Sequence, residues 1–168
     1  MTSVRTVAQA AEAARAGAAL VDAADDEALV GAIRQAGIEV LICGRGPAAD
    51  VSRDAETALG TGGRLLCDGL GAAEQAGQRG ITPDRILVQV TPGETEFAAR
   101  AGWQTLVDVD ADPGAGAVAR AGAVAAVCLW LGASVISTRH VAEVRRCLDM
   151  TESIAGTRVP AWAVRGLA

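Results

Sequence analysis

Polar and ionisable side chains recur in this sequence directly after short apolar runs. Four such runs follow a glycine and end in Asp, Cys or Ser, at residues 16–22, 61–68, 101–108 and 131–137. The glycine suits the left-handed turn that ends a helix, and the apolar run after it predicts a buried strand. Two further runs, at 38–43 and 85–90, bring the expected strands to about six. Ligands of parallel α/β proteins bind at the carboxyl ends of the strands, where these polar residues fall.

The strand ends supply carboxylates, thiols and one amide as candidate ligand-binding groups. They are Asp22, Cys43, Cys67, Asp68, Gln89 and Asp108. Carboxylate and amide oxygens accept hydrogen bonds, and a carboxylate can also move a proton. The alternative interpretation is that these residues are polar only because strand ends reach solvent and cap helices. We assign no catalytic residue from the sequence.

A second candidate site is the tract of Ser137, Thr138, Arg139 and His140. Two hydroxyls, a guanidinium and an imidazole meet there at the expected start of a helix, an arrangement that favours an anion. A helix cap beside an exposed arginine is the simpler alternative. Because His140 is the only histidine and no ligand-spaced motif is present, we expect no metal and no cofactor.

Composition excludes several classes of function. All fifteen basic residues are arginine, which rules out Schiff-base chemistry and lysine-dependent phosphate loops. The net charge of -5 and the lack of a basic cluster argue against a nucleic-acid partner. Four scattered cysteines and no signal peptide predict a cytoplasmic protein with reduced thiols. The uncharged stretch 121–137 is interrupted by Gly132, so we expect a buried helix and strand there, and no membrane.

Helical patterns separate the expected strands. They cover residues 6–16, 26–36, 50–60, 72–79, 92–101, 116–131 and 140–154. This alternation predicts an α/β fold of parallel strand-helix repeats, in one domain at 1–156 with a C-terminal tail at 157–168. A complete eight-unit barrel typically needs about 250 residues. For 168 residues we therefore expect a partial or incomplete TIM-type barrel, with its open edges covered in a homodimer or a larger assembly.

Residues 120–144 resemble the last helix, strand and helix of the dihydropteroate synthases, whose hallmark there is G-A-x-x-x-R-x-H-D-V. Residues 80–86 and 14–22 resemble the approach to that family's sixth strand and its second strand-helix unit. The resemblance implies a pterin-binding TIM barrel that acts in folate biosynthesis, where the family joins a pterin diphosphate to p-aminobenzoate.

The family's functional residues are mostly replaced. Its D-P-G motif falls on 89–91, its S-R-K motif on 110–112 with Asp112 in place of the lysine, and its pterin-holding Asp and Asn on Cys43 and Cys67. Its R-x-H-D positions hold Ser137, Arg139 and His140 in a shifted arrangement. Its first and fifth strands are expected to be missing.

These losses predict a degenerate pterin-binding protein, a pseudoenzyme without synthase activity by itself that acts as a binding or partner subunit. Two alternatives stay open at this stage. One is an active barrel enzyme on a small phosphorylated substrate, with Arg139 holding the phosphate and Asp22, Asp68 or Asp108 as the acid-base group. The other is a purely structural partner of another barrel protein.

Overall fold

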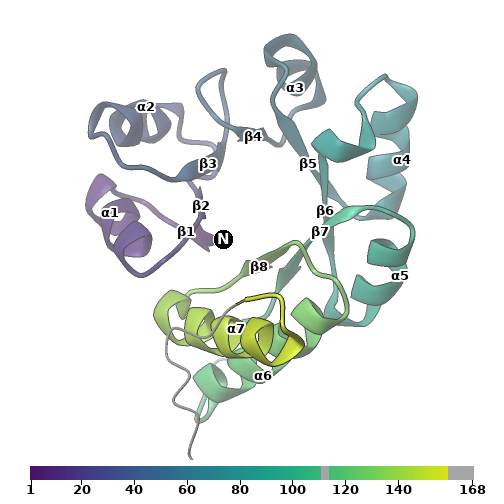
Figure 1. The fold of residues 1–168 in the computed structure, drawn as a ribbon. Coiled ribbons are helices and arrows are strands. Elements are labelled where there is room, and N and C mark those ends of the chain that lie inside the picture. The colour runs from purple at the N-terminus through teal and green to yellow at the C-terminus, as the bar shows by residue number, and fades with distance from the viewer. Residues whose placement is uncertain (111–113, 159–168) are drawn as a thin grey trace, which may run out of the picture.

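Parallel strands in the computed structural model form a ring, and helices surround it (Figure 1). The structure describes residues 1–110 and 114–158. Its strands are β1 (Thr2–Ser3), β2 (Leu20–Asp22), β3 (Leu41–Gly44), β4 (Val51–Ser52), β5 (Arg64–Asp68), β6 (Ile86–Val90), β7 (Gln104–Asp108) and β8 (Val135–Ser137). Each strand pairs in parallel with the next one along the chain.

The two ends of the sheet meet at Met1. Its carbonyl oxygen accepts a hydrogen bond of 2.8 Å from the backbone N–H of Thr138, and its amino group donates to the carbonyl oxygen of Ile136. These contacts bring β1 against β8, so the eight strands form a nearly closed barrel. This near closure leaves little of the open edges that a partner was expected to cover.

The TIM-type α/β class is confirmed, but the predicted strand number is wrong. The barrel has eight strands, and the expectation of six in an incomplete barrel missed β1 and β4. Both are two residues long, too short to show a pattern of apolar residues. The expected absence of a first and a fifth strand is also wrong, since β1 and β5 occupy those positions. Strands of two to five residues let a short chain complete the ring.

The seven helices predicted from the sequence are present. They are α1 (Val7–Arg15), α2 (Glu27–Gln35), α3 (Ala55–Thr61), α4 (Leu70–Gln78), α5 (Thr95–Arg100), α6 (Ala117–Trp130) and α7 (Val141–Ala155), with short 3-10 turns η1 (Pro83–Arg85) and η2 (Pro92–Glu94). The side chains of Thr6, Asp26 and Asp54 cap the first three helices by accepting backbone N–H bonds. The predicted helix at 50–60 begins later, at Ala55, because β4 takes up its first turn.

One crossover in the barrel has no helix. Residues 45–50 alone connect β3 to β4, whereas a parallel crossover usually needs a dozen residues or more. Asp50 holds this link, because its carboxylate Oδ2 accepts the backbone N–H of Ile42 at 2.7 Å and also pairs with Arg34. Figure 1 shows the resulting gap in the outer ring between α2 and α3.

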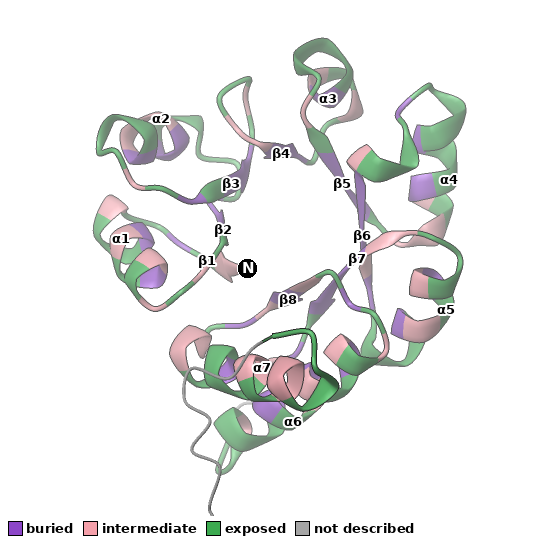
Figure 2. Cartoon of the chain, viewed as in Figure 1, coloured by how far each residue is buried: buried purple, intermediate pink, exposed green. Residues whose placement is uncertain are grey.

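The hydrophobic core lies in two layers, and buried residues follow the strands and the inner sides of the helices (Figure 2). Between strands and helices, aliphatic residues such as Val21, Ile33 and Ile86 form two clusters. A smaller cluster fills the barrel itself. None of the helices in 1–110 and 114–158 has the length and apolar character needed to cross a membrane. Residues 159–168 of the expected tail lie outside the described part of the chain.

Candidate functional site

Alternation along the strands decides which polar side chains enter the barrel. Leu20, Leu66, Leu87 and Leu106 belong to the cluster inside the barrel, and successive strand residues point to opposite faces. The residues two positions further along therefore share that inner face, at the carboxyl mouth of the barrel. They are Asp22, Asp68, Gln89 and Asp108, and Ser137 takes the same place after Val135.

Asp22 forms an ion pair at this mouth that the sequence did not reveal. Its Oδ2 lies 2.9 Å from the guanidinium of Arg53, which follows β4, and its Oδ1 accepts the backbone N–H of Ala24 at 3.0 Å. The side chain of Asp22 is 10% exposed and that of Arg53 42%. Ala24 has φ of 51°, a left-handed conformation that costs a non-glycine residue energy and fixes the turn after β2. The sequence could have placed Arg53 at the mouth only if residues 51–52 had been recognised as a strand.

Asp68 and Gln89 are direct neighbours in the register of β5 and β6, and Asp108 is the neighbour of Ser137 across β7 and β8. The carboxylate of Asp68 makes no hydrogen bond or ion pair with other described residues. It lines a hollow of about 210 Å³ together with Arg53 and Arg79. Residues of α4, among them Gln75 and Ala76, form the other wall of this hollow, and Arg79 lies at the far end of that helix. The mouth itself therefore offers a carboxylate beside an amide, with the guanidinium of Arg53 nearby.

The two candidate cysteines face different environments. Cys43 is fully buried among the residues inside the barrel, where burial, and then the charge of Asp22, raises the pKa of its thiol to about 12. Cys67 points to the opposite side of its strand, toward the helices, and burial raises its pKa as well. Cys67 lies on β5, the fifth strand in barrel order, and its expected correspondence to the family's fourth-strand residue stays a prediction. Protonated thiols are weak nucleophiles, which leaves the chemistry of the mouth to its oxygen groups.

In the tract 137–140, a carboxylate of the chain already uses the hydrogen-bond donors. Asp110 accepts from the hydroxyl of Thr138 at 2.8 Å, from the backbone N–H of Arg139, and from the Arg139 side-chain Nε at 3.3 Å. The Thr138 hydroxyl in turn accepts the backbone N–H of His140. An incoming anion would have to displace Asp110, so anion binding at this tract stays a prediction.

Two other sequence expectations concern metals and Asp112. Among residues 1–110 and 114–158, no three His, Cys, Asp or Glu side chains gather in a group that could hold a metal ion. Asp112, predicted to stand at the position of the family's lysine, lies outside the described residues.

Known structures with the same arrangement of strands identify the fold. No protein-family model matches the chain, and no curated protein matches it. The solved structure of Mycobacterium tuberculosis Rv1207 superposes with a TM-score of 0.75 at 20% identity, covering 96% of this chain and 93% of that one. A Yersinia pestis dihydropteroate synthase with a pterine-sulfa conjugate gives a TM-score of 0.74 at 14% identity, with coverage of 93% and 91%. The chain has the dihydropteroate synthase fold.

The Thermus thermophilus dihydropteroate synthase in complex with 6HMPPP is as similar, with a TM-score of 0.74, 14% identity and coverage of 93% and 92%. The resemblance noticed in residues 120–144 thus extends over the whole barrel. In this dihydropteroate synthase-like barrel, Asp22, Asp68, Gln89 and Asp108 share the inner face at the carboxyl mouth, and Cys67 does not.

Proposed function

We propose that this chain binds a pterin or a related polar bicyclic ring at the carboxyl mouth of its barrel, as a dihydropteroate synthase-like protein of folate biosynthesis. The observation that carries the proposal is the pairing of Asp68 with Gln89 on the inner face of neighbouring strands. A carboxylate and an amide side by side can match the donor and acceptor pattern of a pterin edge. Binding sites commonly combine an apolar wall with a few such polar groups, as the mouth above Leu66 and Leu87 does.

We propose further that the chain lacks synthase activity by itself and acts as a binding or partner subunit. A diphosphate leaving group needs cations, but Arg53 is already paired with Asp22 and Arg139 with Asp110. The unpaired carboxylate of Asp68 would repel a second negative charge. These features favour the neutral ring of a pterin over its diphosphate.

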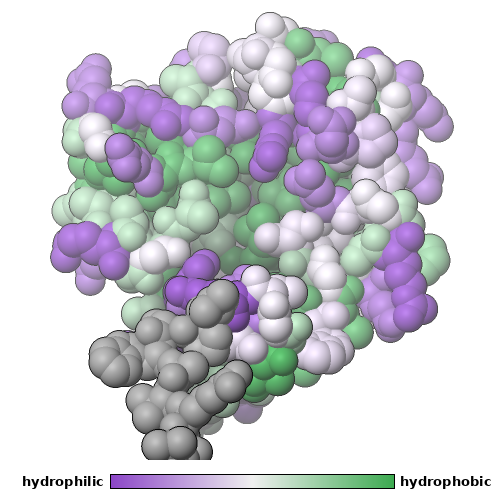
Figure 3. Space-filling model, in the orientation of Figure 1, coloured by the Kyte–Doolittle hydropathy of each residue, from purple (hydrophilic) through white to green (hydrophobic). Residues whose placement is uncertain are grey.

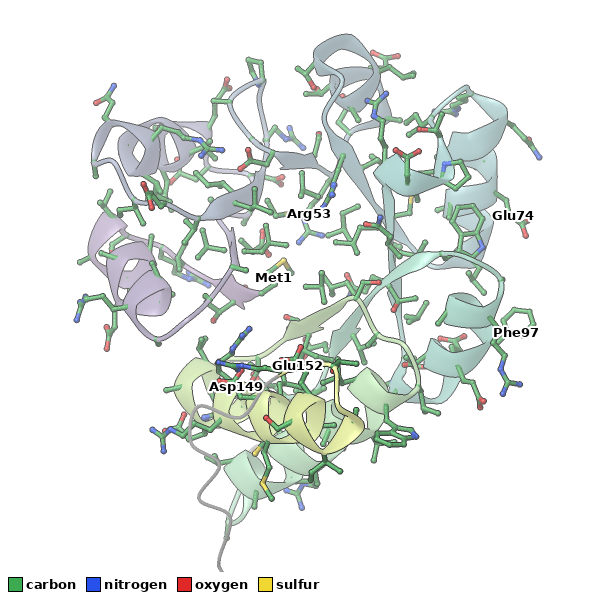
Figure 4. The ribbon with its side chains drawn as sticks, in the orientation of Figure 1. Met1, Arg53, Glu74, Phe97, Asp149 and Glu152 are labelled. Atoms are coloured by element: carbon green, nitrogen blue, oxygen red, sulfur yellow. The ribbon has the colours of Figure 1, made fainter. Side chains whose placement is uncertain are left out.

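Titration calorimetry with a dihydropterin tests the proposal. We expect measurable heat in the wild type and at least a tenfold weaker affinity in Asp68→Asn, because a charged acceptor is replaced by a neutral one. Glu74→Gln on α4 is the matched control, since this exposed acid lies on the outer side of the ring (Figure 4). No heat at millimolar dihydropterin, or equal losses in both variants, would reject pterin binding at the mouth.

One observation supports the second candidate, an active enzyme on a small phosphorylated substrate. Arg53 and Arg79 line the same hollow as Asp68, and the guanidinium of Arg79 makes no ion pair with another described residue, which suits a phosphoryl group beside an acid-base carboxylate. A phosphorylated probe whose binding is lost in Arg79→Gln, while dihydropterin binding persists, would favour this candidate.

We also propose that the protein is a cytoplasmic homodimer or a subunit of a larger assembly. Its cysteines are unpaired, which fits a reducing compartment. Large apolar side chains on α5 and α6 are exposed, with Phe97 at 70% and Trp130 at 66%. Light scattering at micromolar concentration should show a dimer that Trp130→Glu weakens, and a wild-type monomer would contradict this assignment.

A further inference from the structure

The amino-terminal end of the barrel, opposite the candidate site, contains a separate cavity of about 230 Å³. The loops at 17–19 and 133–134 lead into β2 and β8 there, and α7 lies against its side. Its walls are mostly aliphatic. They include Leu20, Leu41, Leu87, Val135, Val144 and Leu148. Figure 3 shows hydrophobic surface inside the hollow at the centre of the ring.

The cavity exists because the barrel interior is incompletely filled at this end. TIM barrels usually contain three layers of four inward side chains each, whereas the buried cluster inside this barrel has six members. Leu41 begins β3 on the inner side, yet it remains 43% exposed. Small residues, among them Gly17, Ala18 and Ala133, line the wall and leave the space open. Exposed apolar surface of this kind is unfavourable in water and favours an apolar occupant.

The rim of the cavity has an excess of positive charge. Arg64 and Arg145 line it together with Glu152 from α7, and Glu152 and Met1 are close to the hollow in Figure 4. Asp149 is shared by two cations, since its Oδ1 lies 2.8 Å from Nε of Arg145 and also pairs with Arg158. Among the charged side chains that line the cavity, two guanidinium groups therefore face one carboxylate, and Arg145 has a further carboxylate partner in Asp149. Arg145 is paired with Asp149, whereas the guanidinium of Arg64 makes no hydrogen bond or ion pair with another described side chain.

We propose that this cavity binds an aliphatic carboxylate, with the hydrocarbon chain between the barrel and α7 and the carboxylate at Arg64. A cavity of about 150 Å³ holds the six carbons of benzene, so this one accommodates roughly eight or nine carbon atoms. Burying such a chain contributes most of the affinity, and the guanidinium selects the anionic head group. The site is independent of the pterin proposal, because it lies at the other end of the barrel.

Titration calorimetry of the full chain with octanoate tests the site, and octylamine serves as the probe of the same length and opposite charge. We expect octanoate to bind at least tenfold more tightly than octylamine, and Arg64→Gln to remove most of that difference. Ala133→Phe should abolish binding of both by filling the cavity. Because that variant could also unfold, Ala19→Leu at an exposed position of the same wall provides a second filling change, and circular dichroism checks the fold of each.

Several outcomes would overturn the proposal. They are the absence of octanoate binding up to its solubility limit, equal affinity for octanoate and octylamine, and unchanged binding in folded variants with a filled cavity. Binding that appears only in a chain shortened after Arg158 would show that residues 159–168 compete for the cavity, and it would also reject a ligand site in the intact protein. Asp68→Asn should leave octanoate affinity unchanged, which separates this result from the test of pterin binding.

Discussion

Replacing Asp50 by alanine should destabilise the whole barrel through the helix-free link between β3 and β4. The Asp50 carboxylate accepts the backbone N–H of Ile42, a fully buried residue, at 2.7 Å. The same oxygen pairs with Arg34. Asp50→Ala removes both interactions at once and leaves the N–H of Ile42 without this acceptor. Because β4 follows directly, the loss also loosens the segment that carries Arg53 to the candidate site.

The expected loss follows from the burial of the two interactions. A buried donor left without an acceptor costs about 1–3 kcal/mol. The side chains of Arg34 and Asp50 are 38% and 32% exposed, so their ion pair adds only about 0.5–1 kcal/mol. The free energy of unfolding should therefore fall by about 2–4 kcal/mol. For a protein of this size, Tm should fall by about 4–16 °C.

Urea and thermal unfolding followed by circular dichroism measure this change. Asp50→Asn keeps an oxygen for the N–H of Ile42 and loses only the charge, and Arg34→Met removes the cation together with its long hydrogen bonds of 3.5 Å to the carbonyl oxygens of Val40 and Ala48. Each should cost about 1 kcal/mol or less. If Asp50→Ala costs no more than Arg34→Met, the hydrogen bond to Ile42 does not stabilise the link, and the reasoning fails.

Three further perturbations test the surroundings of the site. Arg53→Met leaves the nearly buried carboxylate of Asp22 without its cation and should lower the free energy of unfolding by about 1–3 kcal/mol in urea; a change below about 0.5 kcal/mol would show that water replaces the cation. Burial raises the pKa of Cys43 to about 12, so at pH 8 a maleimide should label the exposed Cys147 and leave Cys43 unlabelled in the folded protein, as mass spectrometry can check. The raised pKa also means that stability is fully present below about pH 9 and declines as the pH rises toward 12, because only the unfolded thiol ionises in that range. Hydrogen bonds from Thr57 lower the pKa of Asp54 below 3.8, so Asp54→Asn should lose less stability than the wild type when the pH falls below about 4; parallel acid-unfolding curves would contradict this role.

Much of the candidate site follows from the sequence, because polar residues at the carboxyl ends of parallel strands must lie at one end of the sheet. This rule correctly brings Asp22, Asp68, Gln89 and Asp108 to the inner face of the mouth. The rule does not predict whether Asp68 or Cys67 points into the barrel. Adjacent strand residues point to opposite faces of the sheet, and only the register of the strands decides which face is the inner one. The sequence therefore predicted where the site lies better than it predicted which side chains point into it.

The helices and the six longer strands were determined by local signals, namely apolar periodicity, capping side chains and glycines in left-handed turns. These signals act within a few residues, so they can be read from the chain alone. Tertiary structure decided the rest through contacts between distant residues. Met1 reaches β8 to bring the barrel near closure, Arg53 reaches Asp22 across 31 positions, and Asp110 takes the hydrogen-bond donors of Thr138 and Arg139. Two-residue strands show no periodicity by themselves, and their pairing exists only once the neighbouring strands are in place.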